Sequence, residues 1–251
     1  MRAREYDAWY ETPRGRWIGE REYALLAAML GARRGDTLLD VGCGTGYFTR
    51  RFSTDAGLIA TGLDHDPEFL ACARDRSPGI SFVQGDAMRL PFADDAFDHA
   101  IAVTSLCFLA DERKAVREMV RVARRRIAVG LLNRNSLLYL QKGRGGGQGA
   151  YHGARWHTRR EALALFAGLG LEEIETATAV YLPGGGRFAR WFERRAPASF
   201  PYGAFLVGGG RGTVPRIARS RHGWRIVRDS RQACGRHRVC LTIAHWSDGA
   251  S

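Results

Sequence analysis

Apolar residues along the chain alternate between short continuous runs and helical spacing. The runs predict buried strands, and they lie at 37–42, 58–64, 80–83, 97–103, 127–132, 171–182 and 202–207. Between them, apolar residues recur three and four positions apart, as in 19–31, where Gly31 is a natural helix stop. Strands that alternate with helices favour right-handed βαβ units. The pattern therefore predicts an α/β fold, with a mostly parallel sheet and helices on both faces.

Three of the predicted helices begin with capping signals. Asp66 precedes Pro67, Asp111 precedes an amphipathic stretch, and Thr158 stands three residues before Glu161 in a capping-box pattern. The glycine-rich segment 133–157 interrupts this regular alternation. We expect it to be an insertion rather than another βα unit.

Composition supports an ordinary globular protein. The 251 residues, 45% of them hydrophobic and 25% charged, suit one α/β domain with additions. No apolar run reaches about 18 residues, so no transmembrane helix is expected, and the start lacks the apolar region of a secretory signal. The five cysteines have no paired or metal-binding spacing. We therefore expect no structural metal site and a cytoplasmic location.

The net charge of +12 is unevenly distributed. Residues 208–251 hold nine arginines against Asp229 and Asp248, a net charge of +7, and follow a point where apolar periodicity fades. We expect this segment to be a basic, poorly packed tail. Its arginines are compatible with binding of nucleic acid or an anionic membrane, and equally with an arginine-biased composition.

The sharpest motif is Asp-Val-Gly-Cys-Gly-Thr-Gly at 40–46, between the first strand and a helix. Gly42 and Gly44 allow positive φ and a close approach of the backbone to a ligand. The spacing differs from the GxGxxG of dinucleotide-binding loops. Asp40, two positions before the first glycine, would repel a pyrophosphate, so the loop favours a cationic or zwitterionic ligand.

Two further acids follow the second and third predicted strands. From the end of its strand, Asp64 is placed to accept hydrogen bonds from a ribose diol. Asp86 is placed to accept from an exocyclic amine, while Ala87 and Met88 offer backbone and apolar surface to a flat base. Together with the glycine loop, these residues suit an adenosyl ligand that carries a sulfonium and an amino acid but no phosphate.

The stretch from 38 to 103, with its DVGCGTG loop and the later GDAMRLPFADDAFD, resembles the class I S-adenosylmethionine-dependent methyltransferases. Within them it is most similar to the small-molecule branch of the ubiquinone/menaquinone-biosynthesis enzymes. The resemblance implies a Rossmann-like seven-stranded sheet with an antiparallel last strand, and S-adenosylmethionine as cofactor. The cofactor-binding positions that it implies are Asp40, Gly42, Cys43, Gly44, Gly46, Asp64, His65, Asp86, Ala87, Met88 and Thr104.

Acceptor-side residues are expected from segments beyond the carboxyl ends of the strands. We expect 1–34 to form a helical lid, 35–207 the methyltransferase domain, and 133–157 a substrate-side insertion. Tyr10 and His152, followed by His157, are the candidate catalytic residues. The alternatives are simple packing for Tyr10 and its neighbouring aromatics, and a solvated loop position for His152.

The sequence after the fourth predicted strand, Val-Thr-Ser-Leu-Cys-Phe at 103–108, lacks the motif of enzymes that methylate exocyclic adenine amines. The chain also has no Pro-Cys or Thr-Cys pair for cytosine-C5 methylation. We therefore expect methyl transfer to a small-molecule acceptor. The alternatives are a tRNA or rRNA methyltransferase that uses the basic tail, and a non-catalytic cofactor-binding protein. The acceptor atom and the oligomeric state are left open.

Overall fold

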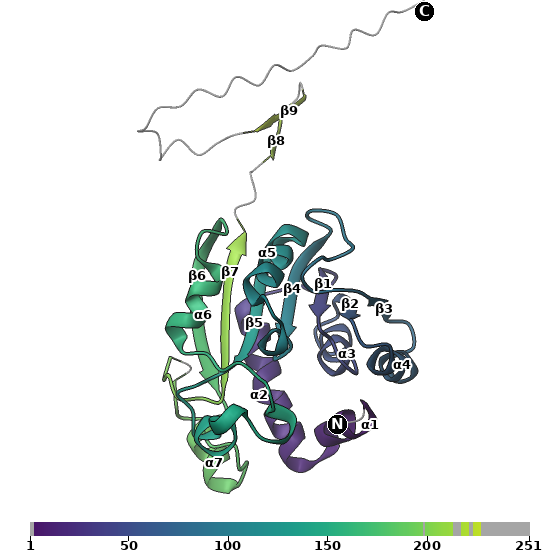
Figure 1. The fold of residues 1–251 in the computed structure, drawn as a ribbon. Helices are drawn as coiled ribbons and strands as arrows, with labels where there is room; N and C mark the ends of the chain where they lie inside the picture. The colour runs from purple at the N-terminus through teal and green to yellow at the C-terminus, as the bar shows by residue number, and fades with distance from the viewer. Residues whose placement is uncertain (1–2, 198, 213–216, 221–222, 227–251) are drawn as a thin grey trace, which may run out of the picture. The chain divides into compact units, whose positions relative to one another are not determined.

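The computed structural model describes residues 3–197, 199–212, 217–220 and 223–226. The chain divides into one unit up to Val214 and a second from Pro215. The first unit is built on a single sheet, shown in Figure 1. Its strands are β1 (Thr37–Val41), β2 (Ile59–Asp64), β3 (Ser81–Gln84), β4 (Phe97–Val103), β5 (Ala123–Leu132), β6 (Leu171–Ala179) and β7 (Phe205–Gly212).

The strand order is β3-β2-β1-β4-β5-β7-β6. The pairings among β1 to β5 are parallel, whereas β7 is antiparallel to both β5 and β6. The predicted seven-stranded sheet with an antiparallel last strand is thus confirmed. The order reverses between β1 and β4, which is where open α/β sheets form a ligand crevice.

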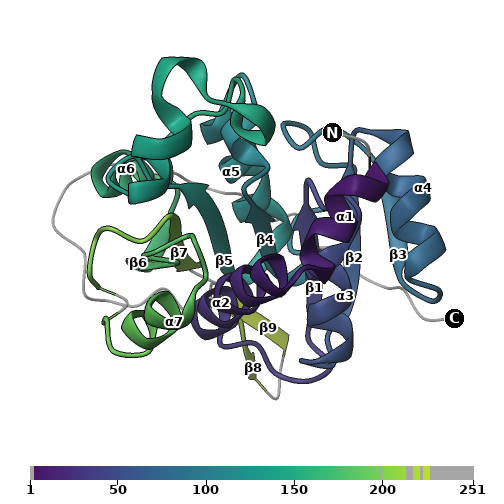
Figure 2. The same ribbon diagram turned by 90° about the horizontal axis from the view of Figure 1, so that it is seen from below.

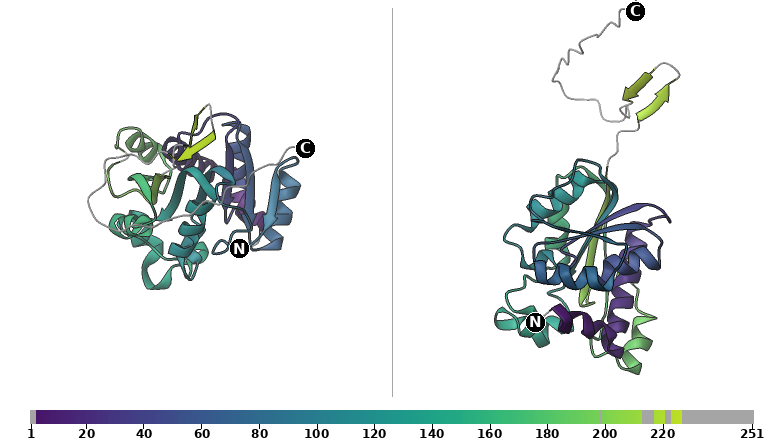
Figure 3. Two further views of the ribbon diagram at one scale, coloured as in Figure 1. Left: turned by 90° about the horizontal axis from the view of Figure 1, so that it is seen from above. Right: turned by 90° about the vertical axis from the view of Figure 1, so that its right-hand side faces the viewer.

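Helices cover both faces of this sheet. They are α1 (Ala3–Glu11), α2 (Pro13–Leu30), α3 (Tyr47–Thr54), α4 (Pro67–Arg76), α5 (Glu112–Val122), α6 (Arg159–Phe166) and α7 (Arg187–Glu193). Figures 2 and 3 show α5 and α6 on one face and α2 and α3 on the other. Among the described residues, no helix combines the length and the apolar character needed to cross a membrane.

The capping signals in the sequence form the expected hydrogen bonds. The Asp66 side chain accepts from the backbone N–H of Glu68, and Thr158 and Glu161 form a complete capping box. Gly31 ends α2 with φ of 55°, in the left-handed region that favours glycine. These local signals fix the helix starts independently of the tertiary structure.

The expected boundary of the domain at residue 207 is wrong. Strand β7 begins at Phe205 and continues to Gly212, so the glycines at 208–210, expected to begin the poorly packed tail, lie inside the sheet. A β-carbon on Gly208 would lie 2.6 Å from Cε2 of Phe166 in α6. One on Gly209 would lie 2.8 Å from Cγ of Met29 in α2. The glycines let helices approach both faces of β7.

The second unit contains β8 (Ile217–Ser220) and β9 (Gly223–Ile226), which pair antiparallel. The rest of the expected basic tail lies outside the described residues. Its packing therefore stays a prediction.

Replacement of Gly208 by alanine tests whether the glycine run is part of the sheet. The added β-carbon would overlap the fully buried ring of Phe166, and such overpacking costs about 1–3 kcal/mol. We expect Gly208→Ala to lower the free energy of unfolding by that amount in urea denaturation. Gly186→Ala is the control, because its β-carbon would meet no atom within 4 Å. Equal midpoints for the two variants would contradict this role of the glycines.

Candidate active site

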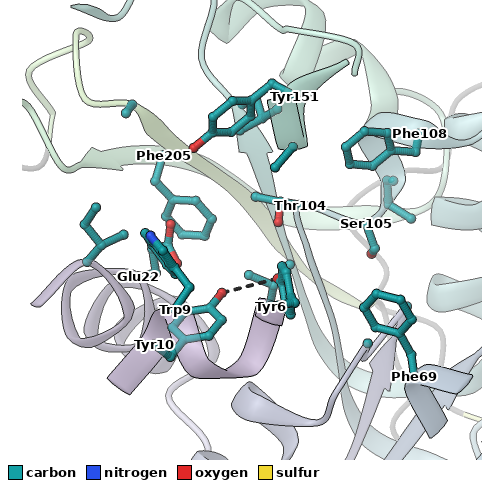
Figure 4. Close-up of a pocket in the computed structure, with 18 of the residues that line it drawn as sticks. Tyr6, Trp9, Tyr10, Glu22, Phe69, Thr104, Ser105, Phe108, Tyr151 and Phe205 are labelled. Atoms are coloured by element: carbon teal, nitrogen blue, oxygen red, sulfur yellow. Dashed lines mark hydrogen bonds between the residues drawn. The ribbon is translucent and has the colours of Figure 1, made fainter. Parts of the chain in front are cut away.

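One cavity of about 990 Å³ opens at the carboxyl ends of the parallel strands. Its walls come from the loops after β1 to β5, from α1 and α2, from the 133–157 segment, and from the chain around β6 and β7. Figure 4 shows part of its lining. The volume lies at the upper end of the range for small-molecule sites.

The glycine loop forms one wall of this cavity. Gly42 and Gly44 line it, with φ of 72° and 55°. The Ser105 hydroxyl donates a 2.7 Å hydrogen bond to the carbonyl of Val41, which joins the ends of β1 and β4. A β-carbon on Gly42 would lie 2.3 Å from that of Ser105. Only glycine therefore allows this approach, and it leaves the loop backbone open to a ligand.

Asp64, the last residue of β2, both shapes the loop and faces the cavity. One carboxylate oxygen accepts a 2.8 Å hydrogen bond from the N–H of Gly44, and the other accepts one of 3.0 Å from the N–H of Asp66. A carboxylate has about four acceptor sites, so positions remain for a ligand. His65 also lines the cavity and is largely exposed.

Apolar surface lies beside these polar groups. Phe69 lines the cavity close to Gly44, and Ala87 and Met88 line it after β3. The Asp86 carboxylate accepts a 2.8 Å hydrogen bond from the N–H of Met88, which holds this turn in place. The open glycine backbone, the carboxylates and the flat apolar surface fit an adenosyl ligand that carries an amino acid.

Three predicted cofactor residues do not line the cavity. Asp40 is buried, accepts a 2.7 Å hydrogen bond from the Thr49 hydroxyl, and has its pKa raised to about 7 by burial. Cys43 is half-buried, and burial raises the pKa of its thiol. Gly46 begins α3 with φ of 75° and packs against Phe82. These residues support the glycine loop from behind, whereas Thr104 lines the cavity as predicted.

The two histidines predicted as catalytic candidates do not line the cavity. His152 is exposed and is not among the residues that line the cavity. His157 is buried and its Nε2 lies 2.9 Å from a carboxylate oxygen of Glu112, so it forms a structural pair. The nearby Asn133 donates hydrogen bonds to the carbonyls of Pro201 and Gly203. The structure therefore gives neither histidine a place beside a ligand.

Helix α1 brings Tyr6, Trp9 and Tyr10 into the cavity wall, as their spacing on one helix face predicts. The Tyr10 ring stacks on Tyr47, with centroids 3.7 Å apart. Burial raises the pKa of Tyr6 to about 12 and that of Tyr10 well above its usual value. Both phenols stay protonated near neutral pH, so Tyr10 is placed to shape the cavity rather than to take a proton.

Asp7 anchors this helix, and sequence reasoning missed it. Its side chain is buried and accepts hydrogen bonds of 2.8 Å from the Thr45 hydroxyl and from the Arg50 guanidinium. Arg76 of α4 completes the cluster with a second ion pair. Asp7 therefore joins α1 to the glycine loop, α3 and α4.

The part of the cavity beyond the glycine loop has a different character. Its lining includes the apolar side chains of Ile18, Leu132, Leu138, Val180 and Phe205. Tyr151 of the 133–157 segment also lines it, as the substrate-side prediction requires.

Glu22 of α2 enters this apolar region, and sequence reasoning missed it too. Among the described residues it has no hydrogen-bond or ion-pair partner, and burial raises its pKa to about 8. The signal was its position in α2, one helical turn from each of the buried residues Ile18 and Leu26 on the same face. This face was hidden because the predicted helix began only at residue 19.

Comparisons with known proteins agree with this site. Residues 39–126 match the family model described as a methyltransferase domain. The demethylmenaquinone methyltransferase of Renibacterium salmoninarum is 38% identical over 40% of this chain and 42% of its own length. The 27-O-demethylrifamycin SV methyltransferase of Amycolatopsis mediterranei is 36% identical over 39% of each chain. The matches thus span about two fifths of these relatives.

The structural similarity to a known protein covers more of the chain than these sequence matches do. A crystal structure of a SAM-dependent methyltransferase from Thermotoga maritima, described as a possible histamine N-methyltransferase, aligns with a TM-score of 0.66 and 24% identity. The alignment covers 83% of this chain and 94% of that one. Residues 39–126 therefore resemble a methyltransferase domain, and the chain shares the fold of this SAM-dependent methyltransferase structure.

Proposed function

We propose that the protein transfers a methyl group from S-adenosylmethionine to a small, largely apolar molecule. The observation that carries this proposal is the continuity of one cavity. Its glycine-loop end fits the adenosyl ligand, and its other end has an apolar lining. The names of relatives such as demethylmenaquinone and 27-O-demethylrifamycin SV methyltransferase also favour a small-molecule acceptor.

The residues of the glycine-loop end would hold the cofactor. Gly42 and Gly44 offer open backbone to its amino-acid part, Asp64 offers carboxylate oxygens to the ribose, and Ala87 with Met88 offers a flat surface to the base. S-adenosylmethionine supplies a methyl group that its sulfonium already activates. The protein then has to place the acceptor atom about 3 Å from that methyl group, in line with the sulfur.

Helix α1 contributes by covering the cavity. Tyr6 and Tyr10 lie between the glycine loop and the apolar end, with their hydroxyls 3.4 Å apart (Figure 4). A cover of this kind excludes water from the reacting groups. Because Asp7 holds α1 on the loop, the cofactor site and the cover form one connected structure.

Cofactor binding should depend on Asp64. We expect S-adenosylmethionine to bind and to raise the thermal stability of the protein by mass action. Asp64→Asn should weaken binding by about 1.5–3 kcal/mol, because hydrogen bonds to a charged acceptor are lost. Isothermal titration calorimetry measures this, with Asp75→Asn on the exposed side of α4 as control. Equal affinity for Asp64→Asn and wild type would refute the proposed cofactor site.

Closure of the site should depend on Asp7. Removing one partner of a buried ion pair costs about 3–5 kcal/mol, so Asp7→Asn should loosen α1 and weaken cofactor binding. Hydrogen exchange of amides 3–11 should become at least tenfold faster. Glu11→Gln is the control on the same helix, because its ion pair with Arg76 is exposed and such pairs contribute little. Unchanged exchange in Asp7→Asn would show that α1 is held by other contacts.

A further inference from the structure

Glu22 differs from the other acids that line the cavity. Asp64 and Asp86 accept hydrogen bonds from backbone N–H groups. Glu22 accepts none from the described residues, although it is half-buried on the face of α2 that carries the buried Ile18 and Leu26. An unpaired carboxyl in apolar surroundings destabilises a fold. No contact within the described structure offsets this cost, which points to a partner that arrives with the ligand.

The surroundings of Glu22 identify the acceptor end of the cavity. Figure 4 shows its carboxylate and the Tyr151 hydroxyl pointing into the cavity on either side of the Phe205 ring. In the same view Phe69, which belongs to the cofactor end, lies on the far side from Glu22. Glu22 therefore faces the space that the acceptor would occupy.

We propose that Glu22 is the general base that removes the proton from a hydroxyl group of the acceptor, which makes the acceptor a phenol, enol or alcohol with an apolar body. This inference rests on the proposed methyl transfer and deepens it. It assigns the acceptor class by the chemistry of the one unpartnered carboxylate in the apolar part of the described cavity.

A cationic acceptor is less well matched to this end of the cavity. Two cationic side chains, Arg14 and Lys142, also line the cavity, and both would repel a cationic acceptor. The Arg14 guanidinium is held in place by a 2.7 Å hydrogen bond to the carbonyl of Pro183. A neutral acceptor with an acidic hydroxyl avoids repulsion from these groups and still satisfies Glu22.

The reaction balances with the groups named. The acceptor O–H bond breaks and its proton moves to a carboxylate oxygen of Glu22. An electron pair of the acceptor oxygen forms the new bond to the methyl carbon as the bond from that carbon to sulfur breaks. That bond's electron pair stays on sulfur. The products are a methyl ether, S-adenosylhomocysteine and protonated Glu22, which returns its proton to solvent when the site opens.

The pH dependence follows from the groups around Glu22. Burial, and to a smaller extent the charge of Glu22, raises the pKa of Tyr6 and Tyr10 of α1, Tyr47 of α3, and Tyr151, so these phenols stay neutral across the range where Glu22 titrates. Because burial raises the pKa of Glu22 to about 8, the base form appears only as pH rises through that value. The kcat/KM for a hydroxylated acceptor should therefore increase from pH 6 to pH 9.

The experiment uses the full chain and a probe panel of 1-naphthol and 1-naphthylmethanol. These represent a phenol and an alcohol, and 1-naphthylmethylamine serves as the cationic counterpart. Formation of S-adenosylhomocysteine is measured for wild type, Glu22→Gln and Glu22→Asp. Glu20→Gln is the control, since Glu20 is exposed on the same helix and does not line the cavity. Calorimetry of S-adenosylmethionine binding accompanies each variant.

We expect at least one hydroxylated probe to be methylated. Glu22→Gln should lower its kcat/KM by about 10²–10⁴-fold, the usual contribution of a general base, and should abolish the rise with pH. Glu22→Asp should fall between Glu22→Gln and wild type. Affinity for S-adenosylmethionine should stay within twofold in every variant, and Glu20→Gln should behave as wild type.

Three outcomes would overturn the assignment while the proposed methyl transfer survives. The first outcome is that no hydroxylated probe is methylated although the cofactor binds. The second is that the ammonium probe is preferred and its methylation depends on Glu22. The third is that Glu22→Gln weakens cofactor binding tenfold, which would place Glu22 at the cofactor. Failure of wild type to bind S-adenosylmethionine would instead remove the proposed function itself.

A stability measurement tests the same carboxyl without any acceptor. The pKa of Glu22 is raised from 4.5 to about 8 in the folded protein, so the folded state binds an extra proton between these values. Wild type should therefore lose stability as pH rises through this range. At pH 4, Glu22→Gln and the control Glu20→Gln should unfold at the same urea midpoint. At pH 9, the midpoint of Glu22→Gln should be higher than that of Glu20→Gln. Equal midpoints at pH 9 would show that Glu22 is well solvated, and would overturn the proposal.

Discussion

A single buried carboxylate, that of Asp7, holds the first helix on the loop that follows β1. Its hydrogen bonds to Thr45 and Arg50, and its ion pair with Arg76, join four segments at the carboxyl edge of the sheet. Without this connection the crevice between β1 and β4 would be an open groove, as in any doubly wound sheet. With it, Tyr6 and Tyr10 turn the groove into a covered cavity. The proposed cofactor and acceptor sites both depend on that cover.

The features that sequence predicts well are those with a local cause. Positive φ demands glycine at Gly42 and Gly44, and an acid at a strand end such as Asp64 points to the same edge of the sheet. Features that depend on tertiary contacts were missed or misplaced. The run at 208–210 has the composition of a linker, and only the approach of Phe166 and Met29 shows that it is a strand.

The difference between features with a local cause and features that depend on tertiary contacts also explains the site residues that were predicted wrongly. Asp40 and Cys43 belong to the glycine motif, yet whether a side chain points into a cavity or behind a loop is decided by packing, and both lie behind. His152 looked chemically suitable but is exposed. The sequence does not single out Glu22, because glutamate is common on helices. Its position facing the cavity follows from how α2 packs against the sheet.

Different surroundings give the acids of this site different roles. Asp64 keeps its loop in place through backbone N–H groups. Asp40 is held by Thr49, and burial raises its pKa to about 7. Glu22 has an apolar environment and no partner among the described residues, which leaves it available to an acceptor. Enzymes commonly separate the roles of similar groups in this way, by burial and hydrogen bonding.

A crystal structure of the protein with S-adenosylhomocysteine tests most directly whether this cavity is one methyl-transfer site. The account predicts the ribose hydroxyls on Asp64, the base beside Ala87 and Met88, and the sulfur directed toward the space that Glu22 faces. It also predicts that room for an acceptor remains between the sulfur and the Glu22 carboxylate. A ligand bound outside the cavity, or one whose sulfur points away from Glu22, would contradict it.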